Sequence, residues 1–357
     1  MVVLACSTPT EEWPSGAPWT VVDASPDLEN GLTILLYHDM EGLSGQNDPN
    51  SFSSRNPEYS EYGRDLLVAD VNAVAAGLFA GGATEVHIVD GHGSGNQAPD
   101  LDYDQLDPRV QPISRDEIFD AYTGLVEGSD YDAVGVVGMH AKTGSFGFAS
   151  HTFTLGIGLE LNGQSITETE LVALSWGRIG VPVIFASGDD KLEADLLTMP
   201  WIKYAKVKNA TSASTADLIP VDEARATLTA QARSAAETVA GAKYLSLNLP
   251  VMGAVRAAPP ANLSALDGVP GIHYEDQHVS FVADSFMEFY DGSLGLIGVA
   301  TGYRGVLFET VFTRDDGLEI RDAFVDALFQ RWYDTESGLY ERPEPLAPAD
   351  RVHHGYN

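Results

Sequence analysis

The sequence predicts an α/β protein with a largely parallel sheet covered by helices on both faces, plus a smaller α+β region in its C-terminal part. Three observations support this fold class. Short apolar runs alternate along the chain with longer segments whose apolar residues have helical spacing. The short runs are apolar almost throughout, as expected of strands that are buried on both faces. Several of them lead directly into glycine and polar residues.

Four apolar runs are expected to be strands of the parallel sheet. They are Thr33–Tyr37, which ends at His38-Asp39; Glu85–Val89, which leads into Asp90-Gly91-His92; Asp132–Gly138, which leads into Met139-His140; and Val181–Ala186, which is followed by Gly188-Asp189-Asp190. Each has the length of a typical buried strand. Parallel strands bring the loops that follow them to the same edge of the sheet.

Helices are expected between and after these strands. Residues 58–80 have apolar residues at helical spacing, and Gly81-Gly82 follow as a stop signal. Residues Ser165–Glu168 have the spacing of a capping box, which predicts the start of a helix that continues through Leu171–Trp176. The alanine-rich stretch 221–240 predicts a further helix.

Composition divides the chain into four parts. Residues 1–30 are expected to be a disordered arm or lipoprotein-type tether, because residues 7–30 are rich in Pro, Ser, Thr, Asp and Glu and lack periodic apolar residues. Residues 31–245 form the expected α/β domain, and 336–357 a Pro-rich tail. The smaller α+β domain, 246–335, is expected to contain a strand over Gly271–Val282, a helix that includes Ser285–Tyr290, and an amphipathic helix after Thr313 with Ile320, Phe324 and Leu328 on its apolar face.

The charge balance of the chain is strongly acidic. Its 357 residues include 20 Lys and Arg and 52 Asp and Glu, for a formal net charge of −32. Such a surface repels phosphate backbones and anionic lipids, so nucleic-acid binding and peripheral membrane binding are not expected. No apolar run approaches the roughly 18 residues of a membrane-spanning helix. Solubility is the simplest reason for the acidity, and a cation site is the alternative for part of it.

Cys6 is the one cysteine of the chain, which excludes an internal disulfide and a cysteine-based zinc site. Residues Met1–Ser7 resemble the end of a bacterial lipoprotein signal, although the apolar stretch is shorter than the usual 7–15 residues or so. Two interpretations stay open. Either the natural start lies upstream and a lipidated Cys6 anchors a periplasmic or cell-envelope protein, or the likeness is chance and the protein is cytoplasmic. Membrane attachment is expected only through Cys6.

Side chains suited to metal binding follow three of the expected strands. Asp39, His92 and His140 each lie within a residue or two of a strand end, and the carboxyl ends of parallel strands meet at one edge of a sheet. Asp39 and Glu41 are two residues apart, so in an extended chain they project from the same face. A buried carboxylate pair is costly unless a cation neutralises it. A lone Asp or His at a strand end usually has a structural role, but the coincidence of several predicts a metal site.

Two other histidines contrast with this group. His38 should point away from Asp39, since neighbouring side chains of a strand alternate between its faces. His87 lies in the middle of an expected strand. Both are therefore interpreted as structural or solvent-facing residues.

The segment His38–Gly45 resembles the signature of the zinc D-aminopeptidases of the DppA type. Further pieces follow in the order of that family and at similar spacings: Asp90-Gly91-His92, Gly138–Ala141, Ser150-His151, Glu168 and Gly188–Asp190. The resemblance extends from about Leu32 to about Ala300. Each piece alone is weak evidence, but the ordered set is specific.

This resemblance implies a function and a site. It implies a metallo-aminopeptidase that hydrolyses short peptides or amino-acid amides, with a preference for N-terminal D-residues. The residues that match the ligands of two zinc ions are Asp39, Glu41, His92, His140 and Glu168, and the catalytic histidine matches His151. The resemblance also implies a ring-shaped homo-oligomer with active sites that face an enclosed chamber.

The implied ligand set is consistent with two-metal hydrolysis. Three carboxylates, two neutral imidazoles and two Zn²⁺ leave a net charge of +1, which suits a developing oxyanion. Oxygen and imidazole ligands without thiolate suit zinc, with manganese or cobalt as alternatives. His151 is the candidate proton shuttle or oxyanion stabiliser. Asp90 is expected to orient His92 or to meet the substrate ammonium, with a plain turn residue as the alternative.

Four residues depart from the family pattern, and none of them is an implied ligand. Tyr37 stands where the signature opens with Ser, Lys142 where a relative has Arg, and Thr167 and Thr169, on either side of Glu168, where that relative has glycines. These departures leave the lining of the pocket, and hence the choice of substrate, open.

Other functions remain as alternatives. A serine hydrolase needs a G-x-S-x-G nucleophile elbow, which the chain lacks, and its glycine pairs do not complete a nucleotide-binding motif. A metal-dependent amidase or esterase on a non-peptide substrate would use the same ligands. A non-catalytic metal- or solute-binding lipoprotein would need the ligands but not His151.

Overall fold

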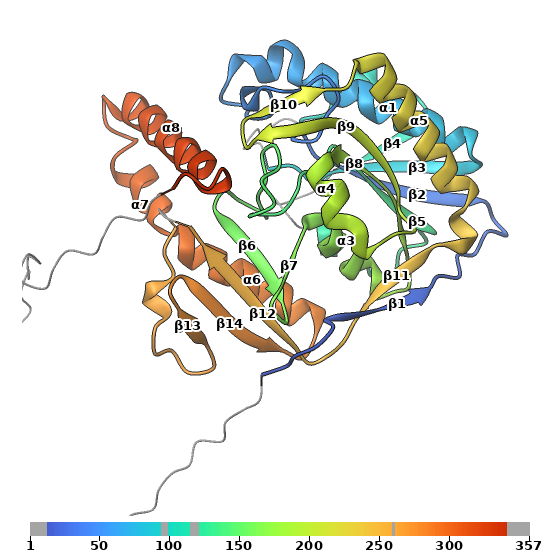
Figure 1. The fold of residues 1–357 in the computed structure, drawn as a ribbon. Helices are drawn as coiled ribbons and strands as arrows, with labels where there is room; N and C mark the ends of the chain where they lie inside the picture. Colours follow the sequence, from blue (N-terminus) through green and yellow to red (C-terminus); the bar gives the residue numbers. More distant parts are fainter. Residues whose placement is uncertain (1–12, 94–98, 115–120, 259–260, 341–357) are drawn as a thin grey trace, which may run out of the picture.

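The computed structural model describes residues 13–93, 99–114, 121–258 and 261–340. Within these residues, seven strands form a central sheet (Figure 1). In spatial order they are β10 (Thr215–Leu218), β9 (Lys203–Ser212), β8 (Val183–Asp189), β5 (Ala133–Val137), β2 (Leu32–His38), β3 (Ala83–Asp90) and β4 (Val110–Ile113). The strands from β9 to β4 are parallel, and β10 is antiparallel to β9 at one edge. This arrangement confirms the expected fold class.

The central sheet is buried on both faces, which explains its continuous apolar strands. In β2, Ile34 and Leu36 belong to a core shared with α1 (Arg64–Ala80) and α5 (Val221–Glu237). The alternate residues Leu35 and Tyr37 belong to a second core, shared with α3 (Glu168–Gly177). A π-helical turn at Tyr59–Gly63 leads into α1. Figure 1 shows α1 and α5 side by side along the outer face of the sheet.

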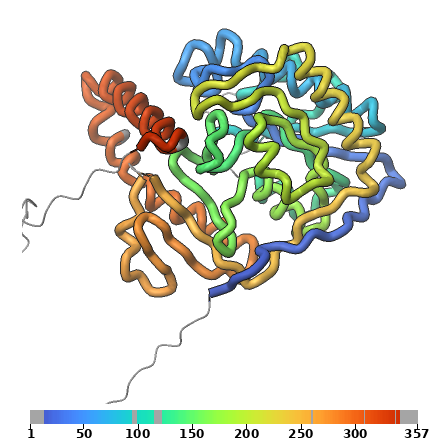
Figure 2. Tube along the Cα trace, in the orientation of Figure 1, coloured from blue at the N-terminus to red at the C-terminus, as the bar shows by residue number. Residues whose placement is uncertain are grey.

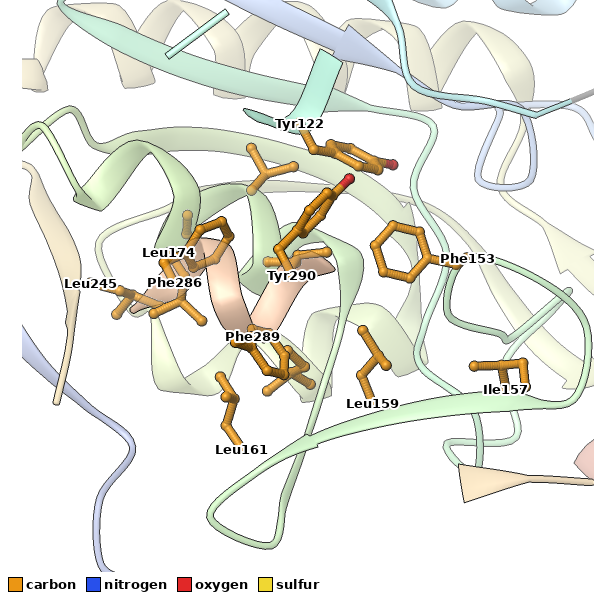
Figure 3. Close-up of a cluster of buried hydrophobic side chains, with 14 of the residues drawn as sticks. Tyr122, Phe153, Ile157, Leu159, Leu161, Leu174, Leu245, Phe286, Phe289 and Tyr290 are labelled. Atoms are coloured by element: carbon orange, nitrogen blue, oxygen red, sulfur yellow. The ribbon is translucent and has the colours of Figure 1, made fainter. Parts of the chain in front are cut away.

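A second sheet is antiparallel throughout. Its five strands in the described chain are, in spatial order, β13 (His273–Glu275), β14 (His278–Ala283), β12 (Val251–Ala257), β6 (Ile157–Leu161) and β7 (Gln164–Ile166). Helix α6 (Phe286–Thr301) packs on β12 and β14. The core between this helix and the sheet contains aromatic side chains, namely Phe286, Phe289 and Tyr290 of α6 and Phe153 (Figure 3). Because β6 and β7 precede residue 245, this sheet takes strands from both sides of the expected domain boundary.

Part of the expected N-terminal arm is ordered. Residues Trp19–Asp23 form β1, which pairs antiparallel with β11 (Lys243–Leu247) in register Trp19↔Leu247. Trp19 is buried. The expectation of a disordered arm is therefore wrong for this stretch, because a short strand whose partner lies more than 200 residues away leaves no periodic signal among flanking Pro, Ser and Thr residues.

Two local predictions need correction. The capping box begins at Thr167 instead of Ser165: the Thr167 hydroxyl accepts a hydrogen bond from the Glu170 backbone N–H (3.0 Å), and the Glu170 carboxylate accepts from the Thr167 N–H (2.8 Å). Ser165 instead lies in β7. The strand expected over 271–282 is a hairpin of β13 and β14, with Asp276 and Gln277 at positive φ in its turn.

The remaining elements are short or lie at the C-terminal end. They are α2 (Ala121–Gly124), α4 (Asp190–Asp195), α7 (Tyr303–Thr310), α8 (Gly317–Glu336), and 3-10 turns at Pro49–Phe52, Tyr103–Gln105, Leu196–Thr198, Val239–Gly241 and Ser264–Leu266. Helix α8 is the helix expected after Thr313, and Figure 2 shows it (red) near the second sheet, whose strands are orange (β12, β13, β14) and green (β6, β7). Cys6 and the Pro-rich tail after residue 340 lie outside the described residues. None of the described helices is long and apolar enough to cross a membrane.

Replacing Gly177 with alanine should destabilise the protein, against the usual preference of helices for alanine. A Cβ on Gly177 in α3 would lie 1.8 Å from the Leu245 carbonyl oxygen of β11. We expect Gly177→Ala to lower the free energy of unfolding by about 1–3 kcal/mol, as overpacked sites do. Gly298→Ala in α6 is the matched control, because open space surrounds that position, and it should raise stability by about 0.5–1 kcal/mol. Denaturant unfolding measures both, and equal effects would contradict the tight α3–β11 contact.

Candidate metal centre

Three neighbouring strands end at the same level of the central sheet. His38, the last residue of β2, pairs with Asp90 on one side and with Val137 on the other. Two further bonds extend this pairing, from Asp39 N–H to Val137 O (2.8 Å) and from Gly91 N–H to His38 O (2.9 Å). The residues that follow the strands, Asp39, His92 and His140, are therefore brought to one place.

The five predicted ligand residues form one buried cluster. Each has an exposed fraction of 7% or less. His140 Nε2 lies 3.4 Å from both Asp39 Oδ2 and Glu168 Oε1, and His92 Nε2 lies 3.4 Å from Glu41 Oε1. Potential ligand atoms lie within 4.8 Å of one another in two groups that share His140, namely Asp39-Glu41-His140 and His140-His151-Glu168. The structure thus brings the residues together, while their role as ligands stays a prediction.

Hydrogen bonds fix the tautomer of the three imidazoles at this centre. His92 Nδ1 lies 2.8 Å from Asp100 Oδ2, His140 Nδ1 lies 3.0 Å from Ala141 O, and His151 Nδ1 lies 2.7 Å from Ala149 O. Carbonyl and carboxylate oxygens accept hydrogen bonds, so each Nδ1 carries a proton and donates it. Each Nε2 is left with the free electron pair that a metal or a proton can use.

Asp100 is a site residue that the sequence did not reveal. Its carboxylate accepts the His92 Nδ1 proton and is itself held by the Tyr59 hydroxyl. Asp90, which was expected to orient His92, instead accepts a bond from the His92 backbone N–H (2.8 Å). Asp100 lies in a loop with no periodic pattern, so its acidic side chain is the only sequence feature that could have indicated a role at the site.

Glu168 is fixed from three directions. It is the first residue of α3, next to the N-cap Thr167. Its Oε2 accepts from the Tyr122 hydroxyl (2.7 Å), and its Oε1 accepts from the Phe153 backbone N–H (2.7 Å). Tyr37 stacks on Tyr122 with ring centroids 5.7 Å apart. The departure from the family pattern at Tyr37 is thus buried behind the centre, where it supports Tyr122.

A buried lysine holds the loop that carries Glu41. Lys208 is fully buried, and its Nζ donates to Glu41 O (2.6 Å) and to Gln46 Oε1 (2.9 Å). The ammonium also lies 4.0 Å from the centroid of the Phe148 ring. Burial lowers the pKa of Lys208 to about 7, against the opposing effect of nearby carboxylates, with Asp189 first among them.

The electrostatics of the cluster favour bound positive charge. Burial raises the pKa of Asp39 well above its usual range, and the charge of Glu41 adds to this effect. Burial alone would lower the pKa of His140, but its hydrogen bond to Glu168 and the charges of Glu168 and Asp39 raise it to about 10. The pKa of His92 is likewise well above its usual value, because Glu41 and Asp100 outweigh burial. Protons on these histidines balance the negative charge of the buried carboxylates, and a divalent cation could replace the protons in that role. Carboxylate oxygens and imidazole nitrogens are also donors that zinc accepts, so the donor set fits zinc.

His151 differs from the other two imidazoles. Burial, followed by the charge of His140, lowers its pKa to about 4, so it is neutral at neutral pH. Its ring stacks on His140 at a centroid distance of 3.9 Å. It also borders a cavity of about 150 Å³ beside the cluster, lined by the polar residues Glu41, His92 and His151 and by the aromatic residues Phe52, Phe153 and Phe329.

The other residues discussed from the sequence lie around the centre. His38 is buried, and its Nε2 lies 4.0 Å from Asp90 Oδ1. His87 is partly exposed, and its Nδ1 forms a hydrogen bond with the Tyr131 hydroxyl (2.7 Å). Neither belongs to a potential ligand group among the described residues. Lys142 forms an ion pair with Asp195 (3.4 Å). Thr169 is fully buried within α3.

Comparisons with known proteins identify the family to which the chain belongs. The M55 peptidase family model, described as D-aminopeptidase, matches residues 32–293. A D-aminopeptidase of Bacillus subtilis (strain 168) is 32% identical over 188 residues, which are 51% of this chain and 66% of that relative, or just under two thirds of its length. The solved Zn-dependent D-aminopeptidase DppA from Bacillus subtilis, described as a self-compartmentalizing protease, has a TM-score of 0.68 at 25% identity and matches 76% of this chain and 98% of its own. The resemblance stated from the sequence is confirmed.

Asp100→Asn should weaken metal binding without unfolding the protein. The change keeps the shape of the side chain but removes the charge that holds His92 Nδ1–H. We expect zinc affinity to fall about 10- to 100-fold, as it does when a group that orients a ligand is lost. Asp102→Asn is the control, since Asp102 caps an exposed 3-10 turn and asparagine can cap it equally. Competition with a chromogenic chelator measures affinity, and unchanged affinity in Asp100→Asn would contradict the assigned role.

Proposed function

Since the chain belongs to the D-aminopeptidase family, we propose that it is a di-zinc aminopeptidase that hydrolyses short peptides or amino-acid amides with N-terminal D-residues. The observation that carries this proposal is the buried cluster of three carboxylates and two Nδ1-protonated imidazoles beside a small cavity. The solved relative is a Zn-dependent D-aminopeptidase, which supports zinc and the D-residue preference.

The proposed ligands are Asp39, Glu41, His92, His140 and Glu168. Their three negative charges and two Zn²⁺ leave a net +1, and manganese or cobalt would accept the same donors. When bound, the metal ions would polarise the scissile carbonyl and lower the pKa of a water molecule. The count of two ions follows the family resemblance, since His140 offers only Nε2 and can therefore bind one ion.

The proposed role of His151 is to move a proton. Its Nδ1–H is held by Ala149 O, which leaves Nε2 as the ring atom that can take up a proton, and the ring lies beside the ligand atoms of His140 and Glu168. Being neutral at neutral pH, it accepts a proton from the attacking water at Nε2. Its low pKa then favours delivery of that proton to the leaving amine. A neutral imidazole with this tautomer has no Nε2 proton to donate to an oxyanion, so the shuttle role is the better supported of the two expected roles.

The size of the cavity supports a small substrate. Its volume of about 150 Å³ is well below the roughly 300–1,000 Å³ of pockets for drug-sized ligands. A single amino-acid residue with its scissile amide is therefore the expected occupant. Among the described residues, three phenylalanine rings line it, so an apolar substrate side chain is expected to pack there.

We also propose that this chain forms a homo-oligomer. The solved relative is described as self-compartmentalizing, and the fold similarity supports a homo-oligomer, ring-shaped by the same resemblance. Sedimentation at several protein concentrations measures the assembly, and a stable monomer at all of them would contradict the proposal.

A panel of D- and L-amino-acid amides, dipeptides and esters tests the proposed activity. We expect hydrolysis of the D-amides and D-dipeptides, loss of activity with a chelator, and its return with zinc. Cleavage of esters alone would favour the esterase alternative. Absence of hydrolysis in zinc-loaded protein would contradict the proposal and favour the non-catalytic one.

His151→Ala should abolish turnover but keep the metal. Loss of a positioned proton shuttle should lower kcat by about 10²- to 10⁴-fold, while the five ligands remain. His87→Ala is the matched control, because His87 is a strand histidine that contacts Tyr131 outside the centre, and its kcat should stay unchanged. Steady-state kinetics and elemental analysis of the same samples separate the two effects. Loss of zinc in His151→Ala would show instead that His151 is a ligand.

A further inference from the structure

Helix α8 lies outside the part of the chain that the family model describes. The match ends at residue 293, whereas α8 spans Gly317–Glu336. Nearly all of the solved relative, 98%, corresponds to only 76% of this chain. In Figure 1, α8 (red) stands beside the second sheet, and its C-terminal part approaches the segment that follows β5 (green). An added element therefore reaches the neighbourhood of the proposed active site.

Trp332 anchors α8 next to His151. The side chain is 2% exposed, and its Nε1–H donates to Ser150 O (2.8 Å). Its ring meets the His151 ring edge-to-face, with centroids 5.5 Å apart and an interplanar angle of 89°. A buried indole with its N–H satisfied makes this contact a fixed part of the fold.

Phe329 lies one turn before Trp332 and borders the cavity itself. It lines the same cavity as Glu41, His92 and His151, together with Phe52 and Phe153. The Arg55 guanidinium lies 5.6 Å from the Phe329 ring centroid and forms an ion pair with Asp326 (3.0 Å), one turn earlier on α8. Its ring centroid also lies 5.8 Å from that of Trp332. The Phe329 ring is thus held from two sides at the wall of the cavity.

We propose that α8 is a selectivity element of the active site, in which Phe329 sets the upper size limit for the apolar side chain of the substrate's reacting residue. This inference rests on the proposed function. With Phe329 in place, the cavity of about 150 Å³ admits a small side chain. Replacing Phe329 with a small residue removes one aromatic wall and enlarges the cavity by the volume of the lost ring. Replacing it with a larger ring makes the cavity smaller.

The test compares two substrates in the zinc-loaded full chain. The measured quantity is kcat/KM for D-phenylalanine amide divided by kcat/KM for D-alanine amide. Phe329→Ala should raise this ratio by about tenfold or more, the scale at which a pocket discriminates side-chain size, and Phe329→Trp should lower it. Phe324→Ala is the matched control: it is a phenylalanine of the same helix that contacts Tyr303 and Phe312 and is not among the residues that line the cavity.

A second readout needs no turnover. The dissociation constants of D-phenylalanine hydroxamate and D-alanine hydroxamate, measured by calorimetry, should shift in the same direction in both Phe329 variants. If the wild type hydrolyses neither amide, the proposed activity is contradicted. The ratio of the two hydroxamate dissociation constants still tests whether Phe329 of α8 limits the size of the bound side chain. Phe329→Trp keeps a large aromatic ring against Trp332, so it tests the inference even if Phe329→Ala does not fold. Unchanged ratios in the folded Phe329 variants, or an equal change in Phe324→Ala, would overturn it.

Discussion

The structure depends on the burial of three carboxylates and two imidazoles in one cluster, to which three adjacent parallel strands and the start of α3 contribute. Carboxylates removed from water are costly unless positive charge balances them. In this chain the neighbouring carboxylates raise the pKa values of His92 and His140. Protons on these two imidazoles therefore supply part of that balance. A divalent cation at the same place would supply it more completely, and folding and metal binding would then be coupled.

Much of the surrounding structure serves to hold this charged cluster in position. Lys208 holds the backbone of Glu41, Asp100 holds His92, and Tyr122 holds Glu168. The loop after β2 is tied a second time by Asp70, which accepts from the Ser44 N–H (2.7 Å) and from Arg225 Nε (3.1 Å). Each of these supporting groups is buried or satisfied by a buried partner, so the ligand atoms have few alternative positions. Such support is typical of metal sites, whose outer partners fix ligand orientation.

The sequence predicted the parts of this account that depend on local pattern. The strands β2, β3, β5 and β8 appear as continuous apolar runs, and Asp39, His92 and His140 follow three of them directly. Glu168 and His151 were singled out only through the resemblance to a family, and the comparisons confirm that the chain belongs to this family. No periodic signal distinguishes either residue.

Other parts could not be predicted because they depend on distant pairing. Tyr122 and Lys208 reach the centre from a short helix and from β9, and their partners Glu168 and Glu41 are far away in sequence. Strand β1 escaped notice for the same reason. Asp100 is only eight residues from His92, but it lies in a loop without a periodic pattern. Helix α8 was predicted from its apolar face, but its docking on His151 through Trp332 follows only from the tertiary structure.

The most direct test of the central claim is the metal content of purified protein, compared between the wild type and Asp39→Ala by elemental analysis. The account predicts about two zinc-class ions per chain in the wild type and the loss of most of them in the variant, with the fold of both checked by circular dichroism. A folded wild type that binds no metal after dialysis against zinc would contradict the account, because the buried carboxylates would then be balanced by protons alone.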